Sequence, residues 1–243
     1  MLLLISSLLL MSCGADKYMK KGEKFLALGE YYDAADQFKQ AYTRTPAKER
    51  DTRGKRALKM AQCYQRINAT PKAIAAYRNA IRYNQASKED QLAYARQLLK
   101  NGDYRQAEKV FLMLKDSMPG NQLVANGLKS AQMAPEWKKQ GSRYIVKRMD
   151  VFNSRRHDYS PVLFGDDYDQ LYFTSTRNEA LGDELSGITG TKAGDIFLSE
   201  KDDRGKWSKP EAIGTGLNTD YDEGACCFTP DGREMYLTQC VTD

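Results

Sequence analysis

Few residues of this 243-residue chain are placed to do chemistry. Its only histidine, His157, stands beside Asp158 and Tyr159. A histidine next to an aspartate could serve as a general base, but that role also needs a reacting group held within hydrogen-bond reach, which adjacency along the chain does not provide. We interpret these residues as structural contacts at the start of a strand. The sequence predicts no catalytic residue and no enzyme.

An acidic turn, Asp166-Asp167-Tyr168-Asp169, offers carboxylates to a cation. Calcium takes about six to eight oxygen ligands, usually from a longer loop. The turn also aligns with the ordinary hairpin turn Pro230-Asp231-Gly232, so a solvated turn is the better interpretation. The glycine-rich stretches match neither a phosphate-binding nor a dinucleotide-binding pattern. The sequence therefore predicts no metal and no cofactor.

The cysteines beyond residue 13 show no spacing typical of a metal site. Cys63 falls on a predicted helix, where a free thiol packs as a small apolar group. A predicted hairpin contains three more: Cys226, Cys227 and Cys240. If this hairpin turns at residues 230–232, Cys240 faces about Glu223 and not another cysteine. An exported chain can form disulfides, so their state stays open, but we expect buried thiols.

The elements that would carry a function are set by an internal repeat of about 34 residues. The first copy, residues 15–48, has Tyr18, Gly22, Phe25, Gly29, Tyr31, Ala34, Phe38, Ala41 and Pro46. The third copy, residues 88–121, has Ala95, Leu98, Gly102, Tyr104, Ala107, Phe111, Leu114 and Pro119. The middle copy, residues 54–87, keeps Ala57, Ala61, Tyr64, Ala73, Tyr77 and Ala80. It departs from the others at Asn68-Ala69-Thr70-Pro71, where they have Gly-Asp/Glu-Tyr.

This pattern resembles the tetratricopeptide repeat, a helical hairpin that stacks into an α-solenoid. Residues 122–133 are predicted to form a closing helix, so the helical domain is expected to span residues 13–134. One repeat cannot bury its apolar faces alone, so stacked repeats present a groove. The resemblance implies a docking surface for a protein partner. A non-repetitive helical bundle is the alternative, and two complete copies disfavour it.

A short apolar run, residues 2–11, precedes the repeats and ends in Leu10-Met11-Ser12-Cys13. It is shorter than the roughly 20 residues that span a bilayer as a helix, and it is typical of an export signal over residues 1–12. The ending resembles the lipobox of bacterial lipoproteins, which implies cleavage before Cys13 and diacylation of Cys13. Gly14 resembles lipoproteins sent to the outer membrane. No Lys or Arg precedes Leu2, so the true start is expected upstream; the alternative is an ordinary signal with an incidental cysteine.

Beyond residue 134 the helical period gives way to short alternating runs with turn residues. We expect a linker over residues 135–150 and then two hairpins that align without a gap, Phe164 on Phe228 and Tyr172 on Tyr236. This alignment also places Asp167 on Asp231. Residues 195–198 and 207–210 supply further strand material, and the Gly-rich segment 182–194 is expected to be a loop insertion.

These units, with Asn218-Thr219 ahead of the second, resemble the propeller repeats of TolB and WD-like envelope proteins. The resemblance covers residues 151–243 and implies the N-terminal part of a β-propeller, about one and a half blades. Propellers close with about four to eight blades, and open sheet edges invite mispairing. We therefore expect a multidomain chain, α then β, that is the front portion of a longer protein.

The charge of the chain is strongly divided. From Asp16 to Arg156 the balance of Lys/Arg over Asp/Glu is +16, whereas from His157 to Asp243 it is −11, and the whole chain carries +5. A basic repeat array could attract an acidic protein, anionic lipid or a cell-wall polymer; two ordinary solvated faces are an equally good interpretation. No reading-helix motif is present, so nucleic acid is not an expected partner.

The order of lipobox, tetratricopeptide repeats and propeller resembles a family of Bacteroidota outer-membrane lipoproteins, the PorE-type components of type IX secretion. In that family an OmpA-like peptidoglycan-binding domain follows the propeller. The resemblance implies a periplasm-facing, lipid-anchored scaffold that links a secretion or gliding complex to peptidoglycan. Two alternatives remain open: a periplasmic ligand- or glycan-binding sensor or accessory lipoprotein, and a hydrolase whose site lies in a missing C-terminal portion.

Overall fold

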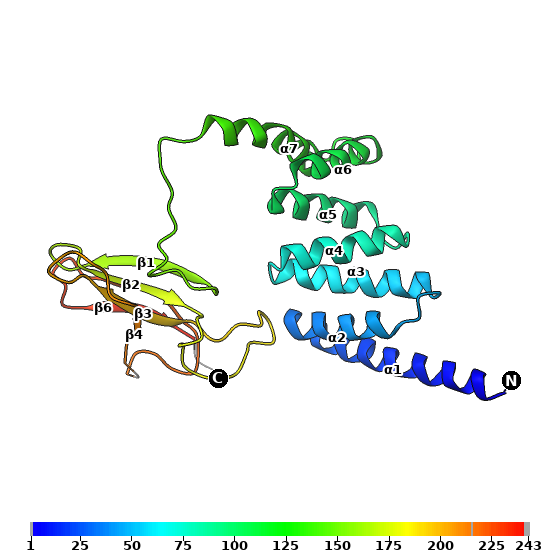
Figure 1. Ribbon diagram of the computed structural model, residues 1–243, viewed down its shortest axis with the longest axis horizontal. Helices are drawn as coiled ribbons and strands as arrows, with labels where there is room; N and C mark the ends of the chain where they lie inside the picture. The colour runs from blue at the N-terminus through cyan, green and yellow to red at the C-terminus, as the bar shows by residue number, and fades with distance from the viewer. Residues whose placement is uncertain (1, 215, 241–243) are drawn as a thin grey trace. The chain divides into compact units, whose positions relative to one another are not determined.

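The chain divides into a helical unit up to Arg143 and a sheet unit from Tyr144. The computed structural model describes residues 2–214 and 216–240, and side chains from Gly14 onward. The order of elements is α then β, as the sequence predicts (Figure 1).

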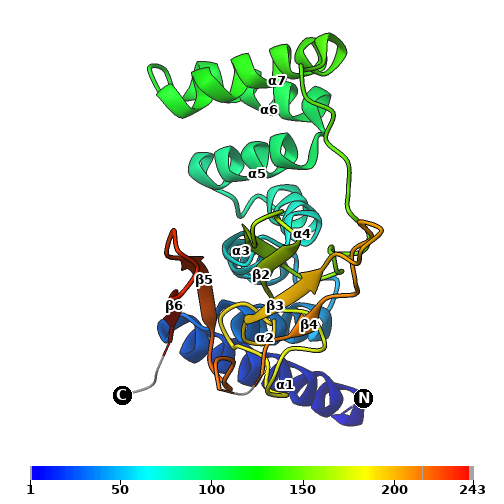
Figure 2. The same cartoon turned by 90° about the vertical axis from the view of Figure 1, so that its left-hand side faces the viewer.

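The helical unit is built from antiparallel helix hairpins stacked in chain order (Figures 1 and 2). Its helices within the described residues are α1 (Leu2–Ala27), α2 (Tyr31–Arg44), α3 (Arg50–Arg66), α4 (Thr70–Arg82), α5 (Lys88–Asn101), α6 (Tyr104–Ser117) and α7 (Gln122–Gln140). Pairs α1–α2, α3–α4 and α5–α6 form the hairpins, and α7 packs on α6. Each pair includes one of the three predicted repeats, although α1 and α3 begin before residues 15 and 54, and together the pairs form a solenoid.

Small residues let the helices approach because they leave room for the aromatic rings. A Cβ on Gly22 of α1 would lie 2.7 Å from the ring of Phe38, and a Cβ on Gly127 of α7 would lie 2.3 Å from the ring of Phe111. Both rings are fully buried. The alternation of small and aromatic residues in the repeat is therefore a packing requirement.

The turns inside the hairpins explain why the middle repeat departs from its neighbours. Gly29 and Gly102 adopt φ angles of 79° and 84°, in the left-handed region where glycine carries no steric penalty. Asn68 takes the equivalent place with φ 57°, and asparagine is among the residues that tolerate this conformation. Pro71 sits in the first turn of α4, where a proline is tolerated. The middle repeat thus keeps the fold with different turn residues.

The helix that closes the solenoid is longer than predicted. We expected it to end at Met133 and a linker to begin at residue 135, but α7 continues through Pro135 to Gln140. A proline within a helix removes one backbone hydrogen bond without always ending the helix. The residues after it favour a helix, and Lys139 pairs with Glu136 at 2.8 Å. The non-helical connection therefore begins at Gly141.

The N-terminal expectations concern side chains that lie outside the described residues. Helix α1 includes the backbone of residues 2–13, but the apolar run and Cys13 have no described side chains. The export signal and lipid attachment at Cys13 stay predictions. Among the described residues, no helix is long and apolar enough to cross a membrane.

The sheet unit contains a four-stranded antiparallel meander and a separate hairpin. The meander has the order β1 (Asp158–Phe164), β2 (Gln170–Ser175), β3 (Asp195–Glu200), β4 (Glu211–Ala212). The hairpin pairs β5 (Glu223–Phe228) with β6 (Met235–Gln239). The rings of Phe164 and Phe228 stack with centroids 4.1 Å apart, so the two sheets pack on each other. A propeller remains a prediction, since two sheets do not make a ring.

The gapless alignment of the two hairpins is wrong in its second half. Val162 lies opposite Tyr172, and Cys226 lies opposite Leu237. The first strands keep the expected offset, which places Val162 on Cys226, so the cross-strand partner Tyr172 matches Leu237 and not Tyr236. The turn of the second hairpin is longer by a single position, which a gapless comparison cannot accommodate.

Candidate functional site

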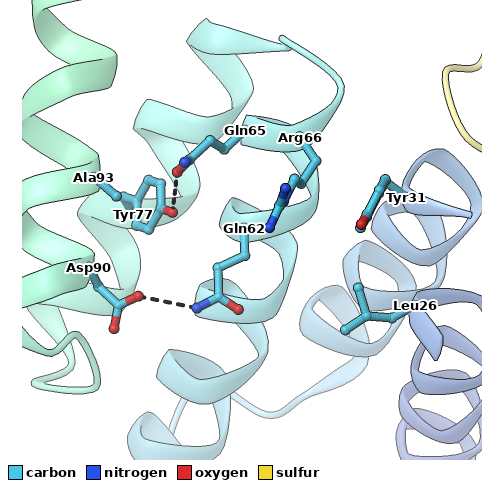
Figure 3. Close-up of a pocket in the computed structure, with 8 residues that line it drawn as sticks. All are labelled: Leu26, Tyr31, Gln62, Gln65, Arg66, Tyr77, Asp90 and Ala93. Carbon is cyan, nitrogen blue, oxygen red and sulfur yellow. Dashed lines mark hydrogen bonds between the residues drawn. The ribbon is translucent and has the colours of Figure 1, made fainter. Parts of the chain in front are cut away.

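A hollow of about 370 Å³ lies on the helical unit and is lined by all three hairpins (Figure 3). The first helix of each hairpin contributes: Leu26 from α1, Gln62, Gln65 and Arg66 from α3, and Asp90 and Ala93 from α5. Second helices add Tyr31 at the start of α2 and Tyr77 of α4. The surface is mixed, with amides, one cation, one carboxylate and two phenol rings.

Helical spacing explains why these side chains share one surface. On α3 the buried residues Ala61, Cys63 and Tyr64 face the neighbouring helices. Gln62, Gln65 and Arg66 are spaced three and four residues apart, so they point together to another side of the helix. Gln62 and Arg66 are exposed. The amphipathic pattern that buries one side of α3 thus presents polar groups on the hollow.

Asp90 is held in place from two directions. Its Oδ2 accepts a hydrogen bond from Ser87 N at 3.0 Å, and Ser87 Oγ accepts one from Asp90 N, a capping box at the start of α5. Its Oδ1 accepts a hydrogen bond from Gln62 Nε2 at 3.1 Å (Figure 3). The contact joins the second and third hairpins across the hollow.

The phenol of Tyr77 forms the polar floor of the hollow. Its hydroxyl donates to Gln65 Oε1 at 2.6 Å, and only 1% of the residue is exposed. Burial raises the pKa of Tyr77, and the carboxylate of Asp90 adds to this shift. The hydroxyl therefore stays a neutral donor, and it orients the amide of Gln65.

Arg66 supplies the positive charge of the hollow. Its guanidinium lies 5.7 Å from the ring of Tyr31, a distance within the range of a cation–π contact. A guanidinium presents several donors in a plane and binds carboxylates in a bidentate manner. The hollow is thus equipped to bind a polar, extended ligand with a negative group.

The residues considered for chemistry from the sequence lie elsewhere, in the sheet unit. His157 is exposed, and its backbone exchanges hydrogen bonds with Thr176 at the start of β1, which fits a structural contact. The acidic turn 166–169 joins β1 to β2. In the described residues no group of three or more His, Cys, Asp or Glu side chains is placed to hold a metal ion.

The expectation of buried thiols is only half right. Cys63 and Cys226 are buried, but Cys227 and Cys240 are exposed, and all four are free. The exposure of Cys227 follows from the pleat, because the neighbouring residues Cys226 and Cys227 of β5 point to opposite faces, whereas Cys240 lies just beyond the end of β6. Glu223 lies opposite Gln239, the neighbour of the expected partner Cys240.

Of the residues that line the hollow, Tyr31 and Tyr77 were named from the sequence as repeat positions, and the other six were not singled out. Leu26, Gln65 and Leu99 occupy the same place in successive copies, counted from Ala15, Gly54 and Lys88. Leu26 and Leu99 also pack against the core of the helical unit, and Leu99 is not among the residues that line the hollow. This repeat position therefore accounts for Leu26 and Gln65 only.

The fold of the helical unit is decided by its stacked hairpins, its small-against-aromatic packing and its repeat length. The helical unit is a tetratricopeptide-like solenoid. No family model matches the chain, and no curated protein matches its sequence.

Solved structures with a similar helical fold are tetratricopeptide domains. The first such domain of Spaghetti (RPAP3), bound to the HSP90 peptide SRMEEVD, is 18% identical over 51% of this chain and 95% of that chain, with a TM-score of 0.42. The C-terminal domain of a Plasmodium falciparum putative FK506-binding protein is 14% identical over 54% and 94%, with a TM-score of 0.44. The Sgt2 domain from Aspergillus fumigatus is 19% identical over 56% and 88%, with a TM-score of 0.41.

Proposed function

We propose that the helical unit is a non-catalytic scaffold that binds an extended segment of a partner protein in the hollow. The observation that carries the proposal is the hollow itself, which is lined by all three hairpins. A surface shared by successive repeats suits a ligand that runs across them, and solenoids use such surfaces for binding.

The chemistry of the hollow favours a segment with acidic side chains. The side-chain amides of Gln62 and Gln65 can donate to and accept from a peptide backbone. Arg66 can pair with a carboxylate, and the surrounding chain from Asp16 to Arg156 has a balance of +16. The positive electrostatic potential of these residues raises the association rate of acidic partners.

A peptide selection tests the binding proposal. Phage-displayed peptides would be selected on the purified 243-residue chain, and the Kd of the best peptide measured by fluorescence anisotropy. We expect an acidic peptide whose affinity falls at least about tenfold on Arg66→Ala, because a charge-assisted hydrogen bond is lost. Arg78→Ala is the matched control, since Arg78 is exposed on α4 and does not line the hollow. Equal losses in both variants would place the peptide elsewhere.

We also propose that the protein is anchored to the outer membrane, facing the periplasm, through lipid on Cys13. The support is the sequence Leu10-Met11-Ser12-Cys13 after a short apolar run. Cells fed an alkyne fatty acid should label the parent and the control Cys227→Ala, but not Cys13→Ala. The Cys13→Ala protein should also leave the membrane fraction. Unchanged labelling of Cys13→Ala would rule out this anchor.

At the level of the cell we propose a role in an envelope complex of the type IX secretion or gliding kind, linked to peptidoglycan. The support is the order of modules in the sequence, and the peptidoglycan link depends on a further domain after residue 243. Sequencing the gene past the codon for Asp243 tests it. Further blades followed by an OmpA-like domain would favour the tether, whereas a Gly-x-Ser-x-Gly motif would favour a hydrolase.

A further inference from the structure

Two hollows lie side by side in the sheet unit, around the turn that leads into β1. Each has a volume of about 460 Å³, and Ser154 and Arg156 line both of them. Arg148 and His157 also line the first hollow, and Arg155 lines the second. The cationic side chains of this turn therefore gather on one surface.

The acidic groups that reach the two hollows are already paired with other cations. Asp158 lines the first hollow and pairs with the buried Arg177, at 2.8 Å between Oδ1 and Nη2. Glu179 lines the second, and its Oε1 lies 3.6 Å from Nζ of Lys209. These carboxylates therefore do not neutralise the arginines of the turn.

Arg155 and Arg156 are the cations of this surface that the chain leaves unpaired. Nε of Arg148 pairs with Oδ1 of Asp150 at 2.8 Å. In the ranges that the structure describes, the guanidinium groups of Arg155 and Arg156 form no hydrogen bond or ion pair, and both residues are exposed. Because both side chains line the second hollow, their like charges repel each other unless an anion lies between them.

Hydrogen bonds fix the backbone that carries these two arginines. Ser154 N and Oγ donate to the carboxylate of Asp158, at 2.6 and 3.0 Å, and Arg156 N donates to Ser154 Oγ at 3.0 Å. His157 N donates to Thr176 Oγ1 at 3.3 Å, and His157 O accepts from Thr176 N at 3.0 Å. A ligand that binds here does not have to order the backbone, which lowers the entropic cost of binding.

The turn before β5 has the same hydrogen bonds but opposite charges. Thr219 N and Oγ1 donate to the carboxylate of Glu223, at 3.0 and 2.6 Å, and Tyr221 N donates to Thr219 Oγ1 at 3.1 Å. Between the hydroxyl residue and the acidic residue stand Asp220-Tyr221-Asp222 in this turn and Arg155-Arg156-His157 in the turn before β1. The structure of the turn therefore does not require cations at these positions.

The basic surface is a local exception within an acidic unit. Residues 144–156 contain four Lys/Arg and one Asp, whereas residues 157–243 contain 7 Lys/Arg and 18 Asp/Glu. A hollow lined by charges of one sign concentrates the electrostatic potential and attracts ions of the opposite sign. An anion would thus be drawn to this surface and repelled from the rest of the unit.

We propose that the two hollows form a binding site for a phosphate group, which Arg155 and Arg156 hold by charge-assisted hydrogen bonds. A phosphate monoester has three acceptor oxygens and a charge of about −1.5 to −2 at pH 7, so it can accept from two guanidinium groups at once. A carboxylate has two oxygens and a single charge, and it matches this pair of cations less well.

Neutral donors at the edge of the first hollow complete the site. Asn153 lines this hollow, and its Oδ1 accepts from Met149 N at 3.2 Å, which leaves Nδ2 to donate to the ligand. The imidazole of His157 can donate as well. The phosphate group belongs either to a soluble phosphorylated compound or to a lipid headgroup, which offer the same chemistry. This inference concerns the sheet unit and does not rest on peptide binding by the helical unit.

Titration of inorganic phosphate into the ¹⁵N-labelled 243-residue chain tests the proposal, with the arginine Nε–Hε signals followed by NMR. The signals of Arg155 and Arg156 should shift and saturate with one shared Kd. Arg155→Gln and Arg156→Gln should each weaken binding at least about tenfold, measured on the arginine that remains, because a hydrogen bond to a charged group is lost. Arg204, exposed in the same unit and outside both hollows, is the matched control. Its signal should stay in place, and Arg204→Gln should leave the Kd unchanged.

Sedimentation with vesicles distinguishes the two sources of phosphate. Vesicles of phosphatidylcholine that contain phosphatidic acid present a phosphate monoester, and vesicles of phosphatidylcholine alone do not. If Arg156→Gln loses more binding to the first kind than Arg204→Gln does, the ligand is a lipid headgroup. If the two variants sediment alike while phosphate binding still depends on Arg156, the ligand is soluble.

Three results would overturn the phosphate site. They are shifts that do not saturate, shifts as large for Arg204 as for Arg155 and Arg156, and equal losses of phosphate affinity in Arg156→Gln and Arg204→Gln. Each would mean that phosphate responds only to the net charge of the chain. Arg66→Ala should leave the phosphate titration unchanged, so a failure of this site and a failure of peptide binding are separate results.

Discussion

Arg177 and Asp158 form an ion pair inside the sheet unit, with 2.8 Å between Nη2 and Oδ1 and less than a tenth of each side chain exposed. The guanidinium also lies 4.7 Å from the ring centroid of Phe197 and donates to the carbonyl of Phe152 at 2.6 Å. The carboxylate of Asp158 also accepts hydrogen bonds from the backbone N and the Oγ of Ser154, in the turn before β1. The guanidinium of Arg177, which follows β2, thus links Phe152 of the turn before β1 to Asp158 of β1.

Replacing this cation should unfold the sheet unit at lower denaturant concentration. Arg177→Met leaves the carboxylate of Asp158 buried without its partner, which costs about 3 to 5 kcal/mol. Urea unfolding monitored by tryptophan fluorescence measures it, because Trp207 packs against the same core. The control Lys209→Ala breaks an exposed pair with Glu179 and should change stability by less than about 1 kcal/mol. Similar losses in both variants would contradict the role of burial.

The sequence predicted the fold best where the pattern records packing. The small and aromatic positions of the repeats, such as Gly22 and Phe38, are in contact in the structure, because the buried ring leaves no space for a side chain at the glycine. A groove was expected from the stacked repeats, but its polar lining was not predicted, since Gln62 and Arg66 are exposed and packing does not constrain their identity. The predicted end of α7 was wrong because a helix can either stop before a proline such as Pro135 or continue through it. The turns before β1 and β5 share a hydrogen-bond pattern, in which two consecutive amides donate to one carbonyl, Met149 O in the first and Gly214 O in the second. This similarity was missed because the turns recur at a slightly longer interval than the first strands do.

The close approach of α7 to α6 makes Gly127 intolerant of a side chain. Gly127→Ala would place a Cβ 2.3 Å from the ring of Phe111, which is fully buried. Overpacking of this kind costs about 1 to 3 kcal/mol, although alanine is the better helix former. Thermal unfolding followed by the helical signal in circular dichroism measures the loss. Lys129→Ala, exposed on the same helix, is the control, and equal melting temperatures would show that the ring can move.

The free cysteines should differ in reactivity according to their burial. Burial raises the pKa of Cys63 to about 11, against an opposing effect of Lys59, so little thiolate exists at neutral pH. Cys227 and Cys240 are exposed. Iodoacetamide should therefore alkylate these two at least about ten times faster than Cys63 in the folded chain. Peptide mass spectrometry measures each site, and urea should remove the difference. Equal rates in the folded chain would contradict the packing of α3.

The charge of Asp195 should contribute less stability to the sheet unit at neutral pH than the protonated carboxyl does at acid pH. The side chain of Asp195 is fully buried. Its Oδ2 accepts a hydrogen bond from Leu181 N at 2.8 Å, and its Oδ1 lacks a hydrogen-bond partner among the described atoms. Burial raises the pKa of Asp195, and the carboxylate of Glu223 adds to this shift. Because the folded-state pKa lies above the unfolded one, stability from this group falls as pH rises through that interval and is restored below it.

Asp195→Asn removes the charge while keeping an acceptor for Leu181, so the variant should be more stable than the parent at neutral pH, by on the order of 1 kcal/mol. The difference should shrink as the pH falls toward the ordinary pKa of an aspartate, where the parent carboxyl is protonated in both states. Urea unfolding at a series of pH values measures both effects. The control Asp203→Asn, at an exposed turn position, should show neither. A gain that is the same at every pH would mean that the amide improves packing and that the charge of Asp195 is not the cause.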